Sequence, residues 1–117
     1  MPRKTLVDLE IERAGEWRKY FEKTFFYLEK IKSIIKKHDP NARVLLFGSY
    51  VRGELRPDSD IDVLIITILG RDSSQRMKLR VEIAREIGDV TPFEIHIVSP
   101  EEYEEWYKKF IDEYFEV

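Results

Sequence analysis

Apolar residues recur every three or four positions between residues 14 and 35, which is the spacing of one face of a helix. The expected stripe consists of Ala14, Trp17, Phe21, Phe25, Leu28, Ile31 and Ile35. The turn-forming residues 39–41 (Asp-Pro-Asn) end this helix. Gly15 either begins or interrupts the helix, so residues 5–13 form a candidate separate arm. We therefore expect a helical segment over residues 1–37.

Three runs of residues predict strands. Residues 43–47 (RVLLF) and 61–68 (IDVLIITI) are short, apolar and rich in β-branched or branched side chains. Residues 93–98 (FEIHIV) alternate strictly and so predict a strand with two different faces. The faces would carry Phe93, Ile95 and Ile97 on one side and Glu94, His96 and Val98 on the other.

Two more helices are expected after the second strand. Residues 73–87 form the first, with Ser73 or Ser74 as N-cap and Gly88 as its end. Its expected stripe consists of Met77, Val81, Ala84 and Ile87. The second, over residues 100–116, begins with Ser99 as N-cap, proline at the first helical position and Glu102 completing a capping box. Its expected stripe consists of Tyr103, Trp106, Tyr107, Phe110 and Tyr114.

This order of elements predicts an α/β (α+β) fold, a small two-layer domain with at least three strands flanked by helices. The 117 residues are enough for one domain, 1–117, and 43% hydrophobic residues can form its core. The absence of cysteine excludes disulfides, thiolate metal sites and thiol catalysis. With two histidines in the whole sequence, any metal must be held mostly by oxygen.

The charge is distributed unevenly. Residues 1–53 carry 12 Lys and Arg against 7 Asp and Glu, whereas residues 54–117 carry 8 against 16. The acidic second half argues against duplex DNA binding, and the division itself favours a protein partner. The sequence has no apolar run long enough to span a membrane and no signal-peptide core, so we expect a cytoplasmic protein.

Two aspartates at the start of a predicted strand are the main candidate for chemistry. Asp60 and Asp62 would project from one face, while Ile61 and Val63 point to the other. Carboxylates this close repel each other unless cations lie between them, and bridged divalent cations are a known solution. If the face carrying Phe93 packs on the helices, Glu94 would reach the same open side and complete an oxygen-rich site for Mg²⁺. His96 shares that face, but we expect it to be structural or at the substrate's edge.

Gly48 and Ser49 end the preceding strand, and Gly53 follows. Glycines let a backbone approach a polyphosphate, and exposed N–H groups at a turn bind anions. Arg52 and Arg56 lie nearby as candidate phosphate contacts.

The segment GSYVRGELRPDSDIDVLI contains Gly-Ser followed, after ten residues, by Asp-x-Asp. This pattern resembles the signature of the DNA polymerase β-like nucleotidyltransferase superfamily, in particular its minimal nucleotidyltransferase branch. The tail FEIHIVSPEEYEEWYKKFIDE is similar to small archaeal nucleotidyltransferase-domain proteins. The resemblance implies a mixed sheet, two Mg²⁺ ions and transfer of a nucleoside monophosphate, AMP from ATP being the expected case, to an acceptor hydroxyl with release of pyrophosphate.

The resemblance also implies roles for individual residues. Gly48 and Ser49 would bind the β and γ phosphates, with Gly53 and Arg52 beside them, and Asp60 and Asp62 would hold both metals. Glu94 would be the third metal-binding carboxylate, at a position where the family more often has aspartate.

Some members of the family are antitoxins that adenylylate a tyrosine of an all-helical HEPN-type toxin, which is a candidate partner. Two further readings remain open. In one, the chain is a non-catalytic neutralising subunit of a two-protein complex; in the other, a neighbouring chain supplies its substrate domain. Aromatic residues beyond the predicted stripes also favour a partner surface or a homo-oligomer; they are Tyr20, Phe26, Tyr27 and Phe115.

Overall fold

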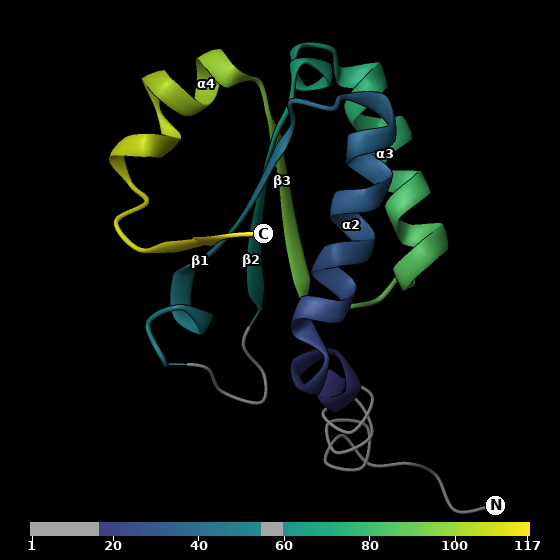
Figure 1. Cartoon of the computed structure of the whole chain (residues 1–117), viewed down its shortest axis with the longest axis vertical. Coiled ribbons are helices and arrows are strands. Elements are labelled where there is room, and N and C mark those ends of the chain that lie inside the picture. The colour runs from purple at the N-terminus through teal and green to yellow at the C-terminus, as the bar shows by residue number, and fades with distance from the viewer. Residues whose placement is uncertain (1–16, 55–59) are drawn as a thin grey trace, which may run out of the picture.

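A mixed four-stranded sheet forms the centre of the protein (Figure 1). The computed structural model describes residues 17–54 and 60–117. In the sheet order β3-β2-β1-β4, β1 is antiparallel to β2 and β4, whereas β2 and β3 are parallel. The strands are β1 Arg43–Phe47, β2 Ile61–Ile66, β3 Phe93–Val98 and β4 Tyr114–Glu116. The expected α+β fold is confirmed.

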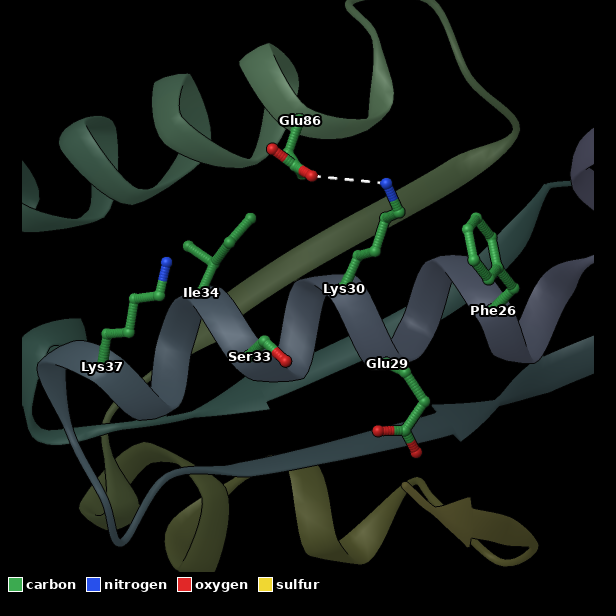
Figure 2. Close-up of a pocket in the computed structure, with 7 residues that line it drawn as sticks. All are labelled: Phe26, Glu29, Lys30, Ser33, Ile34, Lys37 and Glu86. Atoms are coloured by element: carbon green, nitrogen blue, oxygen red, sulfur yellow. Dashed lines mark hydrogen bonds and ion pairs between the residues drawn. The ribbon is translucent and has the colours of Figure 1, made fainter.

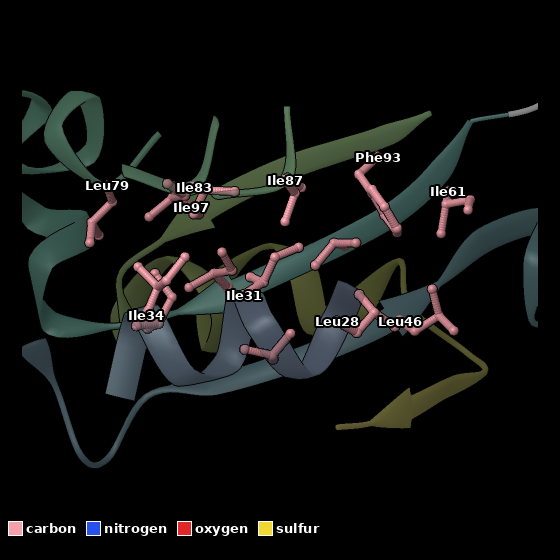
Figure 3. Close-up of a cluster of buried hydrophobic side chains, with 14 of the residues drawn as sticks. Leu28, Ile31, Ile34, Leu46, Ile61, Leu79, Ile83, Ile87, Phe93 and Ile97 are labelled. Atoms are coloured by element: carbon pink, nitrogen blue, oxygen red, sulfur yellow. The ribbon is translucent and has the colours of Figure 1, made fainter. Parts of the chain in front are cut away.

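Helices α2 (Thr24–His38) and α3 (Ser73–Ile87) cover one face of the sheet, and residues 17–22 are helical as well (Figure 1). Alternate residues of the strands point toward them and form the main core (Figure 3). Its members include Leu28, Ile31 and Ile35 from α2, Leu79, Ile83 and Ile87 from α3, and Val44, Leu46, Ile61, Val63, Ile65, Phe93 and Ile97 from the strands.

The opposite face of the sheet is covered by a short C-terminal segment (Figure 1). This segment contains α4 (Pro100–Glu105) and the 3₁₀ helix η3 (Tyr107–Lys109). A smaller buried cluster joins it to the strands: Leu45, Leu64, Ile66, Val98 and Tyr103. The sheet therefore has one fully packed face and one face that is only partly covered.

The first predicted helix is interrupted at Lys23, and its final residue is His38, just before the predicted turn. Residues 1–16, including Gly15 and the candidate arm, lie outside the described residues. Two aromatic side chains differ from the expectation. Phe25, placed in the stripe, is 49% exposed, whereas Tyr20, expected at the surface, is buried and donates a hydrogen bond to the Ile87 carbonyl.

Helix α3 has the predicted bounds but a different cap and a different buried face. The N-cap is Asp72, whose side chain accepts from the Ser74 N–H, so the assignment to Ser73 or Ser74 was wrong. Met77 and Val81 of the expected stripe are exposed. The residues that contact the sheet are instead Leu79, Ile83 and Ile87, spaced four apart.

The predicted C-terminal helix over residues 100–116 is also wrong beyond Glu105. The capping box of Ser99 and Glu102 forms as expected, but the backbone leaves helical geometry at Trp106, with φ −128° and ψ −65°. The chain then returns as β4, which pairs with β1, and the side chains of Arg43 and Glu116 approach to 2.6 Å. Pairing fills the hydrogen-bonding edge that β1 would otherwise expose, which a continued helix could not do.

A shallow hollow of about 370 Å³ lies on the outer side of α2 and α3 (Figure 2). Lys30 of α2 and Glu86 of α3 form an ion pair across it at 3.3 Å, and the exposed Phe26 lies at one end. In the described part of the chain, no helix is long and apolar enough to cross a membrane.

A buried aspartate connects the end of α2 to the end of β2. Asp39 is 4% exposed, and its carboxylate accepts hydrogen bonds from the Thr67 hydroxyl at 2.8 Å and from the N–H groups of Asn41 and Ile68. Burial alone would raise the pKa of Asp39, but these hydrogen bonds and the nearby Lys36 outweigh burial and lower it.

We expect Asp39→Asn to reduce the free energy of unfolding at pH 7 by about 1.5–3 kcal/mol, because it removes a charged hydrogen-bond acceptor. The lowered pKa means that the charge stabilises the fold fully above about pH 4. This contribution is lost as the pH falls through the folded-state pKa. Urea unfolding between pH 7 and pH 2.5 should show the gap between wild type and variant narrowing, while the exposed Asp89→Asn stays close to wild type. A gap that is constant with pH would contradict this role.

Candidate functional site

The parallel pairing of β2 with β3 brings two carboxylates together. Asp62 and Glu94 are direct partners in the register, and Leu64 pairs with His96 two residues further along. Adjacent strands are about 4.8 Å apart, so side chains of partnered residues on one face lie next to each other. Because Ile61 and Phe93 point into the main core, Asp62 and Glu94 point to the partly covered face.

His96 completes this acidic cluster. Its Nε2 atom lies 3.7 Å from Glu94 Oε1 and 4.0 Å from Asp62 Oδ1. Each of the three residues offers an atom within 4.8 Å of the others, which is close enough to hold one metal ion. From the sequence, His96 was expected to be structural or at the substrate's edge and not a ligand. The sequence feature that indicates a ligand role for His96 is its position two residues after Glu94, on the same strand face.

The cluster carries more negative than positive charge. Burial is the largest effect that raises the pKa of Asp62. The charge of Glu94, a hydrogen bond with Glu94 and the charge of Asp60 raise this pKa further. His96 lowers it, but the net shift is upward. Within residues 17–54 and 60–117, the ion pairs of Asp62 and Glu94 are those with His96. A cation between the carboxylates would relieve this repulsion, so the donor set fits a divalent ion.

Asp60 lies one residue before β2 and is exposed. It is not part of the three-residue group whose ligand atoms lie within 4.8 Å, although its charge acts on Asp62. The structure thus brings Asp62 and Glu94 together and places Asp60 at the edge of the cluster.

Gly48 fits closely against the Asp62 carboxylate. It follows Phe47, the register partner of Asp62, and has a φ of +78°. A Cβ atom at this position would lie 2.2 Å from Asp62 Oδ2. Glycine is therefore required both by the backbone conformation and by the space that the carboxylate occupies.

The residues after Gly48 form a tight turn beside the cluster. The 3₁₀ helix η1 (Gly48–Tyr50) contains Ser49, and hydrogen bonds from the N–H groups of Arg52 and Gly53 close the turn. Gly53 is exposed with a φ of +72°, and the Arg52 side chain lies 3.4 Å from Glu54. Arg52 and Gly48 also line a cavity of about 110 Å³. Arg56 lies outside the described residues.

A larger cavity of about 490 Å³, which the sequence did not predict, lies directly above the acidic cluster. One side is the sheet and the other is the C-terminal segment. The lining residues are Phe47, Asp62, Glu94, His96, Trp106, Tyr107, Phe110 and Ile111. The helical assignment of residues 100–116 concealed this cavity, because it forms only where the chain turns back toward β1.

Comparisons with known proteins agree with one another. Residues 28–114 match the family described as nucleotidyltransferase domain. The protein adenylyltransferase MntA of Thermococcus cleftensis is 44% identical over 45 residues, 32% of this chain and 46% of that protein. The spectinomycin 9-adenylyltransferase of Enterococcus faecalis is 29% identical over 97 residues, 76% of this chain and 38% of that protein. The chain thus spans less than half the length of these relatives.

Solved structures show the same fold. A crystal structure assigned as a nucleotidyltransferase superposes with a TM-score of 0.63 and 33% identity, over 76% of this chain and 95% of the other. A second, from Sulfolobus solfataricus, has a TM-score of 0.50 and 22% identity, over 99% of this chain and 89% of the other. The second match supports the fold alone.

The contact between Gly48 and Asp62 can be tested with a matched pair of glycine variants. We expect Gly48→Ala to weaken Mn²⁺ binding by about tenfold or more, because the new Cβ displaces the Asp62 carboxylate. Gly53→Ala also places alanine at positive φ, at a cost of about 1–3 kcal/mol, but its Cβ meets nothing within 4 Å. Calorimetric titration with Mn²⁺, alongside thermal unfolding, separates the two effects. Equal losses of Mn²⁺ affinity in both variants would show that the contact is irrelevant.

Proposed function

The chain belongs to the nucleotidyltransferase domain family, and we propose that it transfers a nucleoside monophosphate, AMP from ATP, to an acceptor hydroxyl. The observation that carries this proposal is the juxtaposition of Asp62 and Glu94 beside the glycine turn at Gly48. The carboxylates provide a cation site, and the turn provides backbone N–H groups for phosphate.

The proposed cofactor is a pair of Mg²⁺ ions. Asp62 and Glu94 would hold them, and His96 lies within ligand distance of both. Asp60, one residue before β2 and outside this group, would join them as a ligand when the ions bind. Bound Mg²⁺ neutralises triphosphate charge and lowers the pKa of an acceptor hydroxyl. The excess negative charge around Asp62 supports a cation at this position.

Gly48, Ser49 and Gly53 are the proposed phosphate-binding residues, with Arg52 as an additional cation. Ser49 offers a hydroxyl donor at the start of the turn, and the close approach of Gly48 to Asp62 places phosphate-binding and metal-binding groups side by side. Arg52 is exposed and would exchange its contact with Glu54 for a phosphate oxygen.

In the proposed reaction the acceptor oxygen forms a bond to the α phosphorus. The bond from that phosphorus to the oxygen that bridges to the β phosphate breaks, pyrophosphate leaves with the bonding electrons, and the hydroxyl proton passes to solvent. The protein's contribution is to hold the triphosphate and the acceptor in line, which reduces the entropic part of the barrier.

We propose a protein hydroxyl as acceptor. One relative is named a protein adenylyltransferase and the other a spectinomycin 9-adenylyltransferase, so the names of these two relatives include a protein and a small molecule as acceptors. The exposed aromatic residues Phe26 and Phe115 and the divided charge of this chain favour a protein. A tyrosine of a HEPN-type toxin is the specific candidate implied by the resemblance to minimal nucleotidyltransferases.

We expect Asp62→Asn and Glu94→Gln to reduce label transfer from [α-³²P]ATP by more than about a hundredfold, because each removes a charged oxygen ligand. The assay contains Mg²⁺ and the co-expressed partner protein, and EDTA should abolish transfer. Glu29→Gln, an exposed substitution on α2, is the matched control. If the two site variants transferred label as well as this control, the assignment of Asp62 and Glu94 to the active site would be wrong. If they lost transfer but still neutralised the partner, neutralisation would depend on binding and not on catalysis.

A further inference from the structure

Two large aromatic side chains are exposed at the rim of the cavity above the acidic cluster. Trp106 is 62% exposed and Phe110 is 65% exposed, although both belong to a segment that packs on the sheet. Their ring centroids are 5.2 Å apart, with the planes tilted by 54°. Leaving two such rings in water is unfavourable, and exposed aromatic surface of this kind marks a binding site.

The rings inside the cavity continue this aromatic surface. His96 lies between Phe47 and Tyr107, with ring centroids 5.9 Å and 6.4 Å away. The ring of His96 therefore belongs both to the aromatic lining and to the acidic cluster. A ligand in this cavity would contact rings on the sheet and on the C-terminal segment while lying next to the carboxylates.

We propose that this cavity binds the nucleobase of the nucleoside triphosphate, with Trp106 and Phe110 as stacking surfaces. The inference rests on the proposed function and adds the site that holds the base. Every nucleobase has a flat π face, so aromatic side chains bind it without a specific hydrogen-bond pattern. The volume of about 490 Å³ lies in the range typical of small-molecule sites, roughly 300–1,000 Å³.

The arrangement of the two cavities supports a nucleotide over other flat ligands. The larger one shares Phe47, Phe110 and Ile111 with the smaller cavity that contains Gly48 and Arg52. The smaller cavity offers Arg52 and the backbone of Gly48 to an anionic chain, and Asp112 and Glu113 also line it. A nucleotide has an aromatic ring at one end and an anionic chain at the other, so it can span both cavities. Trp106 and Phe110 line the larger cavity, so the base is the end that belongs there. The phosphates would extend from it past the cations that Asp62 and Glu94 would hold, toward Gly48 and Arg52.

The test compares ATP with inorganic tripolyphosphate, both with Mg²⁺, by calorimetry. We expect the double variant W106A/F110A to bind ATP about tenfold or more weakly while its affinity for tripolyphosphate stays within about twofold of wild type. The single conservative variant Trp106→Phe should retain most of the ATP affinity. Phe26→Ala removes an aromatic residue on α2 that is 56% exposed and serves as the control.

Several results would overturn the inference. If W106A/F110A bound ATP as tightly as wild type and unfolded at the same temperature, the base would not bind in this cavity. An equal loss of affinity for ATP and for tripolyphosphate would show that the two rings support the structure of the phosphate-binding turn and do not contact the base. A higher KM for the acceptor protein with unchanged ATP affinity would assign the cavity to the acceptor. These results leave the proposed function standing, whereas the proposed function fails if the wild-type protein transfers no label from ATP in the presence of Mg²⁺ and the partner protein.

Discussion

The register between β2 and β3 determines which side chains meet in the acidic cluster. Asp62 meets Glu94 because the two strands are parallel and aligned at these residues. A shift by one residue would turn Glu94 toward the main core and expose Phe93, since side chains alternate between the faces. The core opposes that shift, because it would expose Phe93 and Ile97, which are buried in the main core. Hydrophobic packing on one face thus holds two repelling carboxylates together on the other.

The partly covered face of the sheet is shaped by the C-terminal segment. Tyr103 fixes α4 to the buried cluster on this face, and β4 fixes the end of the segment to β1. The residues between these two attachments pass over the acidic cluster and form the wall of the larger cavity. Asp39, at the far end of β2, joins α2 to the start of the 3₁₀ helix η2 (Ile68–Arg71) and so fixes the opposite end of the same strand.

Strand faces and the local motif could be predicted from the sequence, but long-range pairing could not. Alternation in residues 93–98 places Glu94 and His96 on the same side, and the structure agrees. The prediction of a helix over residues 100–116 was wrong. Aromatic residues three and four positions apart also fit a chain that packs on the sheet through α4 and then pairs as β4. Pairing with β1 favours the strand over the helix, and the local sequence of Tyr114–Glu116 does not indicate that pairing partner. For the same reason, the cavity beside Trp106 was missed.

The most direct test of this account is a crystal structure with Mn²⁺ and α,β-methylene-ATP, an analogue that cannot release pyrophosphate. We predict anomalous density for Mn²⁺ between the carboxylates of Asp62 and Glu94, and phosphate oxygens beside the backbone of Gly48 and Ser49. Mn²⁺ bound elsewhere, or a triphosphate on the face covered by α2 and α3, would contradict the account. The register of β2 and β3 would then serve the fold alone.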